Sequence, residues 1–292
     1  MTARVAGFHA PEISAKHRLA TMAYVIRAIL FDLDETLFDH RRAVAFAATS
    51  WTESLCPGHP LSMEAPALWL DLENKHLPAW HAGECSFSEQ RRRRLREFCG
   101  RMQVPVPADL DAAYARFLVW YEEAWAAFPD AGEAIEALSG RGLTLGVLTN
   151  GVPVQQEAKL RRIGLMDRLD PVLTPDSLGG YFKPWAECYL RAAAKLGLRP
   201  EEIVLVGDNL MLDAVGPARV GMRGVWLDRY CAGSASPGGV ATITTLSELP
   251  GVVDAFDAPA ARGARAPYGP ARQAEPVTPE AATRRRLNPR RA

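Results

Sequence analysis

The sequence has no long apolar run and no excess of either charge. Its 34 lysines and arginines balance 34 aspartates and glutamates, and its longest apolar runs fall far short of the roughly 18 residues that a membrane span requires. Residues 1–20 also lack the apolar core of a signal peptide. We therefore expect no membrane contact and a cytoplasmic location, and a uniformly basic protein that coats nucleic acid is excluded.

Cysteine is scarce and unpatterned. The five cysteines are an odd number, are widely spaced and form no CxxC pair, so neither a disulfide framework nor a structural zinc site is expected. Apolar residues make up 48% and charged residues 23% of the chain, which is typical of a globular protein. The length of 292 residues predicts one or two domains.

Both ends of the chain lack the pattern of a folded domain. Residues 1–22 show no periodicity and predict a flexible extension, unless translation starts at Met22. Residues 258–292 hold eight arginines, six prolines and only two acidic residues, a composition that predicts a disordered tail. The arginines could contact nucleic acid or an acidic partner, but a solvated tail is the favoured interpretation.

Between the ends, short apolar runs alternate with helical patterns. The runs are Val25–Phe31, Leu143–Thr149, Asp170–Leu173, Ile203–Val206, Gly224–Leu227 and Ala241–Thr244. Helical periodicity marks Gly132–Ser139, Val154–Ile163, Trp185–Leu196 and Leu210–Val220. Near-continuous apolar strands that alternate with helices predict an α/β protein with a Rossmann-like parallel sheet, covered by helices on both faces.

One long stretch interrupts this alternation. Four helical patterns with no strand between them occupy Val44–Leu55, Ala65–His81, Ser88–Met102 and Asp109–Ala126, with Ser88 as a predicted N-cap. We therefore expect a core domain of residues 23–40 and 128–257 and an all-helical cap of residues 41–127. Such an insertion can act as a lid that excludes water and contacts the leaving group. The arginine run Arg91–Arg94 is expected to form a mostly solvated helix face.

Polar residues gather where the predicted strands end. Asp32, Asp34, Thr149, Asn150, Asp208 and Asn209 follow strands, and Lys183 and Asp213 lie on nearby loops or helix starts. The carboxyl ends of parallel strands meet at one edge of a sheet, where ligands bind. Four carboxylates packed together repel one another, and oxygen ligands without cysteine or histidine suit Mg²⁺.

These residue types can divide the work of phosphoryl transfer. One carboxylate can attack phosphorus to form an aspartyl-phosphate, and a second, two residues further along, can protonate the leaving oxygen and later take a proton from water. A lysine and a threonine hydroxyl can bind the phosphoryl oxygens.

Four motifs in this order make the sequence resemble the haloacid dehalogenase (HAD) superfamily over residues Ala23 to Phe256. They are Asp32-Leu33-Asp34-Glu35-Thr36, Leu148-Thr149-Asn150-Gly151, Lys183-Pro184, and Gly207-Asp208-Asn209 with Asp213. The resemblance implies that Asp32 is the nucleophile and Asp34 the general acid/base. It implies that Thr149, Asn150 and Lys183 bind the phosphoryl group. It further implies that Asp32, the Asp34 carbonyl and Asp208 hold Mg²⁺, with Asp213 and Asn209 in support.

The insertion resembles the helical C1 cap of the subfamily that includes phosphoglycolate phosphatase and N-acylneuraminate-9-phosphatase. We therefore expect a Mg²⁺-dependent phosphatase of a small organic phosphate ester, active as a monomer or homodimer. Three alternative functions stay open: a 2-haloacid dehalogenase, a phosphomutase, and a non-catalytic binding protein on the same scaffold. A dehalogenase is disfavoured because such enzymes do not usually carry the second aspartate, here Asp34. The sequence does not identify the substrate.

Overall fold

The core of the protein is a six-stranded sheet in the order β3-β2-β1-β4-β5-β6, with every neighbouring pair parallel. The computed structural model describes residues 25–231 and 240–258. The strands are β1 Ala28–Phe31, β2 Thr144–Leu148, β3 Val172–Leu173, β4 Ile203–Gly207, β5 Arg223–Leu227 and β6 Ala241–Ile243. This confirms the predicted α/β fold, with the first strand in the middle of the sheet.

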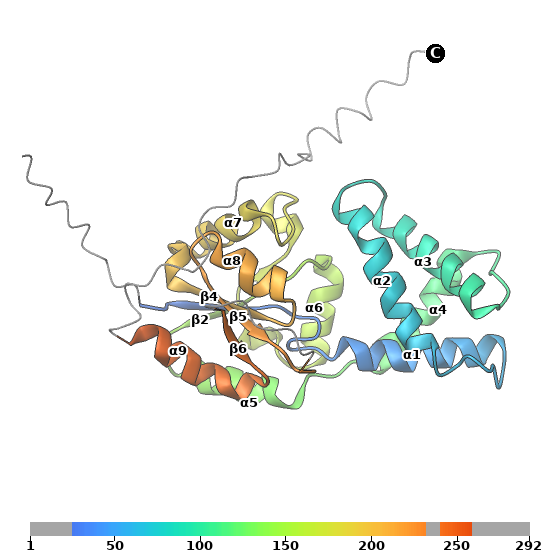
Figure 1. Ribbon diagram of the computed structural model, residues 1–292, viewed down its shortest axis with the longest axis horizontal. Helices are drawn as coiled ribbons and strands as arrows, with labels where there is room; N and C mark the ends of the chain where they lie inside the picture. Colours follow the sequence, from blue (N-terminus) through green and yellow to red (C-terminus); the bar gives the residue numbers. More distant parts are fainter. Residues whose placement is uncertain (1–24, 232–239, 259–292) are drawn as a thin grey trace, which may run out of the picture.

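Helices cover both faces of the sheet, as Figure 1 shows. They are α5 Pro129–Ser139, α6 Pro153–Arg162, α7 Ala186–Leu196, α8 Gly216–Ala218 and α9 Leu249–Asp257. Side chains of β1 alternate between the faces: Ile29 and Phe31 pack in the cluster that holds α5 and α9, and Ala28 and Leu30 pack in the cluster that holds α7. This two-sided burial explains why the strands read as continuous apolar runs.

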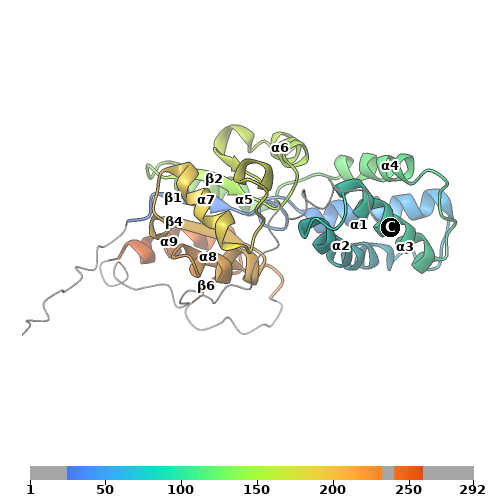
Figure 2. The same cartoon turned by 90° about the horizontal axis from the view of Figure 1, so that it is seen from above.

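Four helices between β1 and α5 form a separate unit, seen to one side of the sheet in both Figure 1 and Figure 2. They are α1 His40–Leu55, α2 Ala65–His81, α3 Phe87–Met102 and α4 Leu110–Glu123. The unit has an aromatic core in which Trp69 stacks on Phe117 at 3.9 Å and meets Phe98 edge-on at 5.2 Å. We call this unit the cap, and the division of the chain into a core domain of residues 23–40 and 128–257 and a cap domain of residues 41–127 stays a proposal.

The element boundaries correct two predictions and add one helix. The N-cap of α3 is Ser86, whose hydroxyl accepts from the Glu89 amide at 3.1 Å, and Ser88 lies inside the helix. Leu210–Val220 is not one regular helix, because a π-helical turn over Leu210–Val215 precedes α8. The sequence reading also missed α9, which follows β6.

Two further predictions fall outside the part of the chain that the structure describes. They are the N-terminal extension of residues 1–22 and the arginine-rich tail beyond residue 258. Within the described ranges, no helix is both long enough and apolar enough to cross a membrane.

Candidate active site

Strand register brings the first and fourth motifs together at the carboxyl edge of the sheet. Phe31, the last residue of β1, pairs with Val147 on one side and Val206 on the other. The Asp32 amide continues the ladder by donating to the Val206 carbonyl at 2.9 Å. Asp32 therefore leaves the sheet between the ends of β2 and β4. Thr149 is the first residue after β2, and Asp208 is the first residue after β4.

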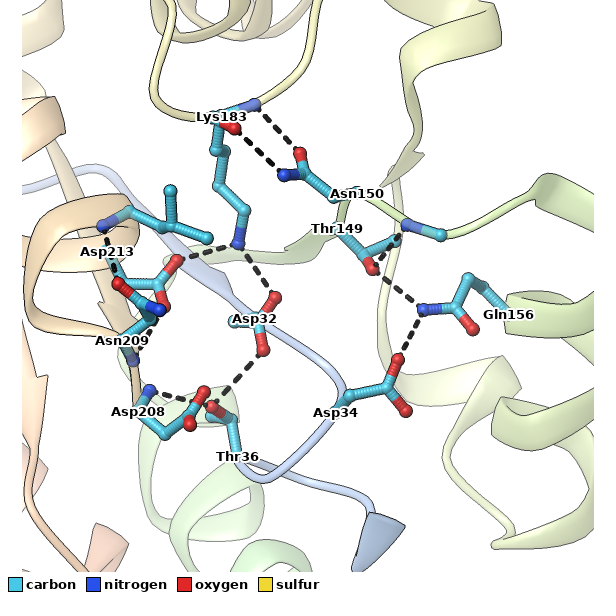
Figure 3. Close-up of polar contacts among 12 residues, drawn as sticks. Asp32, Asp34, Thr36, Thr149, Asn150, Gln156, Lys183, Asp208, Asn209 and Asp213 are labelled. Atoms are coloured by element: carbon cyan, nitrogen blue, oxygen red, sulfur yellow. Dashed lines mark hydrogen bonds and ion pairs between the residues drawn. The ribbon is translucent and has the colours of Figure 1, made fainter. Parts of the chain in front are cut away.

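Asp32 forms a buried ion-pair cluster with two other motif residues, drawn in Figure 3. Lys183 Nζ lies 2.7 Å from Asp32 Oδ1 and 2.6 Å from Asp213 Oδ1. Burial by itself would lower the pKa of Lys183, but the two carboxylates outweigh burial and raise it. Gly207 makes room for this cluster, because a Cβ there would lie 2.4 Å from Asp213 Cγ. The lysine is therefore a fixed cation beside Asp32.

Asp208, the third acidic residue near this cluster, contacts no positively charged side chain in the described part of the chain. Asp32, Asp208 and Asp213 each offer a carboxylate oxygen within 4.8 Å of the others. Burial and then the charges of Asp32 and Asp213 raise the pKa of Asp208 to about 8. Burial, joined by Asp213, raises the pKa of Asp32 to about 7 against the opposing effect of Lys183. This excess of buried carboxylate fits a hard divalent cation.

Asp34 has a separate set of partners on α6. Its Oδ1 lies 2.5 Å from Lys159 Nζ, and its Oδ2 accepts from Gln156 Nε2 at 3.0 Å. Burial alone would raise the pKa of Asp34, but the charges of Lys159 and His40 and the hydrogen bonds from Lys159 and Gln156 together outweigh burial and lower the pKa. Asp34 is therefore held as a carboxylate, pointing away from the Asp32–Lys183 cluster in Figure 3.

Thr149 and Asn150 have different functions at the end of β2. The Thr149 hydroxyl accepts from Gln156 Nε2 at 2.7 Å and from the Gly151 amide at 3.2 Å, so its own proton remains available to an acceptor. The Asn150 side chain instead clamps the backbone of Lys183, accepting from its amide at 2.7 Å and donating to its carbonyl at 2.9 Å. We therefore assign the Asn150 side chain to positioning Lys183, and any contact with phosphate to its backbone.

Two more residues shape the loops around the cluster. Asn209 caps the turn that follows β4, because its Oδ1 accepts from the amides of Met211 and Leu212, both at 3.1 Å. Its own amide donates to Asp213 Oδ2 at 3.1 Å. The Thr36 hydroxyl accepts from the Asp208 amide at 3.2 Å, which ties the loop after β1 to the loop after β4. Asn209 thus contacts Asp213, and the support of both residues for a metal ion stays a prediction.

The cavity in front of these residues extends to the cap. It has a volume of about 280 Å³ and is lined from the core by Asp32, Asp34, Thr149, Lys183 and Asp208, and from the cap by His40, Glu73, Gln90, Arg91, Arg94 and Tyr121. All eight predicted site residues line this cavity and lie opposite a wall of cap helices, the other three being Asn150, Asn209 and Asp213. The arrangement can hold a phosphoryl group at the sheet edge and its organic portion against the cap.

A buried charge network fixes the cap wall. Glu73 Oε2 lies 2.6 Å from Arg94 Nη1 and 3.4 Å from His40 Nε2, and His40 Nδ1 lies 2.7 Å from the Tyr121 hydroxyl. Burial would raise the pKa of Glu73, but Arg94 and His40 lower it far below its usual range. Burial would lower the pKa of His40, but Glu73 raises it. Arg94 is 4% exposed, so the predicted solvated arginine face is wrong at this position.

The sequence reading missed Gln156, Lys159 and Glu73. A signal for the first two was present, because Gln156 lies three residues before Lys159 and four before the buried Leu160, the spacings of one helix face. A lysine on an apolar face next to a motif indicates a buried partner. Glu73 carried no such signal, because its partners come from α1 and α3.

Comparisons with known proteins agree with this fold. A model of the haloacid dehalogenase-like hydrolases matches residues 26–221. The chain is 31% identical over 207 residues to a ribulose-1,5-bisphosphate 5-phosphatase of Halopiger xanaduensis, covering 69% of this chain and 84% of that protein. It is 31% identical over 206 residues to an (S)-2-haloacid dehalogenase of Pseudomonas sp. strain YL, covering 70% of this chain and 83% of that protein. Among solved structures, the HAD hydrolase YfnB of Bacillus subtilis gives a TM-score of 0.65 at 22% identity, covering 79% of this chain and 99% of that one.

The family match spans β1 to the end of α8 and so includes all four motifs. The structural likeness independently supports the parallel-sheet fold with its helical insertion. The relatives include both phosphatases and a dehalogenase, so the match defines the family and leaves the reaction open. The chain belongs to the haloacid dehalogenase-like hydrolases.

Proposed function

We propose that this protein is a Mg²⁺-dependent phosphatase that hydrolyses a small organic phosphate monoester through an aspartyl-phosphate on Asp32. One observation carries the proposal. Three carboxylates lie within 4.8 Å of one another, and Lys183 is the one positive side chain that contacts them in the described residues. A divalent cation balances this charge and draws in a dianionic phosphoryl group.

The residues present fit the expected cation. Asp32 and Asp208, with the backbone carbonyl of Asp34, would hold Mg²⁺, and Asp213 supports them through Lys183 and Asn209. The bound ion supplies charge neutralisation, so that a carboxylate nucleophile can approach a negatively charged phosphoryl group. Lys183 and the free proton of the Thr149 hydroxyl are placed to donate to the phosphoryl oxygens.

The first step is attack by an Asp32 carboxylate oxygen on phosphorus. The new O–P bond forms as the bond from phosphorus to the leaving-group oxygen breaks, and a proton from Asp34 completes the released alcohol. Lys183 holds one Asp32 oxygen at 2.7 Å and thereby fixes the direction of the carboxylate. This orientation is worth a large rate factor, because the reacting atoms must be in line.

The second step hydrolyses the aspartyl-phosphate. The Asp34 carboxylate takes a proton from water, the resulting hydroxide attacks phosphorus, and the bond to Asp32 breaks to release inorganic phosphate. The contacts of Asp34 with Lys159 and Gln156 keep it ionised, as this step requires. In the first step Asp34 must instead carry a proton, so the Lys159 contact must weaken when the substrate binds.

The relatives support hydrolysis of a phosphate ester. The relative from Halopiger is named a ribulose-1,5-bisphosphate 5-phosphatase, and others are named glyceraldehyde 3-phosphate phosphatase and pyrimidine 5'-nucleotidase. The dehalogenase relative keeps displacement of halide from a 2-haloacid as the second candidate. A dehalogenase attacks carbon and has no use for a site rich in unbalanced carboxylate, which favours the phosphatase.

Phosphate release from p-nitrophenyl phosphate tests the proposal. We expect turnover in Mg²⁺, none in EDTA, and a fall of at least 10³-fold in Asp32→Asn, because the amide has the same shape but is not a nucleophile. Asp176→Asn is the matched control, since Asp176 is an exposed aspartate just after β3 and should keep full activity.

Two outcomes would contradict the proposal. Wild-type turnover in Asp32→Asn would place the nucleophile elsewhere. Release of chloride from 2-chloropropionate without Mg²⁺, together with no release of phosphate, would establish the dehalogenase. The cytoplasmic location and the choice between monomer and homodimer stay predictions from the sequence.

A further inference from the structure

The cavity contains one cation that has no carboxylate partner. Among the positive groups that line it, Lys183 contacts Asp32 and Asp213, Lys159 contacts Asp34, and His40 and Arg94 contact Glu73. His81 is not a cation at neutral pH, because burial lowers its pKa to about 4. Arg91 is the exception, since it forms no ion pair or hydrogen bond in the described part of the chain.

Aromatic rings hold the Arg91 guanidinium in place. Its Cζ lies 4.1 Å from the centre of the Phe87 ring and 4.8 Å from that of Tyr114. Phe87 comes from one turn earlier on α3, and Tyr114 comes from α4. Contact with two rings limits the rotamers of the arginine and removes water from its faces, so the edge of the guanidinium is left as the donor surface. This edge is the geometry that pairs with a carboxylate or phosphate through two hydrogen bonds.

Other polar atoms beside Arg91 also lack partners. Gln90 is 0% exposed, and both of its amide atoms are buried without a hydrogen bond, as are Arg91 Nε and His81 Nε2. All three residues line the same cavity as Asp32. Unpartnered polar atoms inside a protein are costly, so their concentration on one wall indicates that a polar ligand covers this wall.

We propose that Arg91 binds a second anionic group of the substrate, so that the preferred substrates are phosphate monoesters that also carry a carboxylate or a second phosphoryl group. The inference rests on the proposed function, because it takes the phosphoryl group to lie at Asp32 and the rest of the substrate to reach the cap. The core end of the cavity then neutralises the reacting phosphoryl group, and Arg91 neutralises the charge at the other end.

Matched pairs of esters test this assignment. 3-Phosphoglycerate differs from glycerol 3-phosphate by a carboxylate in place of a hydroxymethyl group, and fructose 1,6-bisphosphate differs from fructose 6-phosphate by a phosphoryl group. We expect wild type to favour the member with the additional anionic group in at least one pair, and the pair identifies that anion. Arg91→Ala should lower kcat/KM about 10- to 100-fold for that ester, as expected for a charged hydrogen bond, and less than about threefold for the partner that has only the reacting phosphoryl group.

Two further variants separate recognition from folding. Arg91→Lys keeps the charge and should recover part of the preference. Arg96→Ala removes an exposed arginine of the same helix and should leave both members of each pair unchanged. An equal loss in Arg91→Ala on esters with and without the second anionic group, or a wild type that favours neither ester with that group, would overturn the assignment.

A binding measurement removes the dependence on turnover. Calorimetry on Asp32→Asn gives the Kd of 3-phosphoglycerate, glycerol 3-phosphate and the fructose pair, and the same titrations are run on Asp32→Asn with Arg91→Ala. Tighter binding of a charged ester that is lost with Arg91 supports the inference even if no ester is hydrolysed, in which case the proposed function alone fails. A preference that survives Arg91→Ala refutes the inference whatever the turnover.

Discussion

The unbalanced carboxylates at the sheet edge predict that Asp208→Asn stabilises the metal-free protein. Carboxylate oxygens of Asp208, Asp32 and Asp213 lie within 4.8 Å of one another, and at this separation two like charges repel by about 3 kcal/mol at an effective dielectric constant of about 20. Asparagine keeps the shape and removes one charge. In EDTA at pH 8 we therefore expect the variant to exceed wild type by about 3 kcal/mol in the free energy of unfolding.

The raised pKa of Asp208 determines how the free energy of unfolding changes with pH. Burial and neighbouring charge raise the pKa of Asp208 to about 8, far above the value of about 3.9 in an unfolded chain. Between these values the folded state keeps a proton that the unfolded state has released, so the free energy of unfolding falls as pH rises. The advantage of Asp208→Asn should thus be largest near pH 8 and small near pH 4, because the unfolded state regains the proton as pH falls through about 3.9.

Urea unfolding in EDTA at pH 4, 6 and 8 measures the effect, and a second series contains Mg²⁺. A cation at 100 times its Kd stabilises a folded protein by about 2.7 kcal/mol, and we expect this gain in wild type and not in the variant. The exposed Asp176→Asn serves as the charge-matched control. The reasoning is refuted if Asp208→Asn is less stable than wild type in EDTA at pH 8, or if Mg²⁺ stabilises both proteins equally.

Two further substitutions test the packing of the site and of the cap. Gly207→Ala should lower the free energy of unfolding by about 1–3 kcal/mol, measured by urea unfolding, because the new Cβ would lie 2.4 Å from Asp213 Cγ. Glu73→Gln should lower it by about 3 kcal/mol at pH 7 by leaving Arg94 buried without a carboxylate. Since the pKa of Glu73 is lowered in the folded state, its stabilisation is lost as pH falls, and the difference from wild type should shrink below about pH 4.

Both substitutions have internal controls. Gly132→Ala lies in α5 with no atom within 4 Å of the added Cβ, and should stabilise the helix by about 0.5–1 kcal/mol. A similar gain in Gly207→Ala would show that Asp213 can move aside freely. Glu89→Gln removes an exposed carboxylate that contacts Arg93, and a loss there as large as in Glu73→Gln would mean that burial of Arg94 is not the cause.

The sheet and the core motifs could be predicted from the sequence because each depends on local pattern. Continuous apolar runs identify strands buried on both faces, and the residue that follows a run must lie at the carboxyl edge. This is why Asp32, Thr149 and Asp208 could be placed together before the structure. The helix Ala65–His81 matched its predicted bounds, and its buried residues are Ala65, Trp69 and Leu72.

The cap wall could not be predicted, because its residues come from different helices. Arg91 and Arg94 belong to one charge run, yet the first contacts aromatic rings of α3 and α4 and the second an acid of α2. Which side a helix turns to the cavity depends on the packing of all four helices, and no local pattern encodes it. The function of the Asn150 side chain in the core could not be predicted either. Its two hydrogen bonds to the Lys183 backbone depend on the tertiary position of a loop that lies 33 residues away in the sequence.

A continuous set of contacts joins Asp34 to the interior of the cap. Lys159 Nζ, paired with Asp34, also lies 5.7 Å from the centre of the Tyr121 ring, and the Tyr121 hydroxyl contacts His40, whose other nitrogen faces Glu73. We therefore expect a change at Glu73 to reach the proposed acid/base through these contacts. We expect Glu73→Gln to reduce kcat at temperatures where circular dichroism shows that it is still folded. A variant with reduced stability but wild-type kcat would show that the cap wall and the proton-transfer residue act independently.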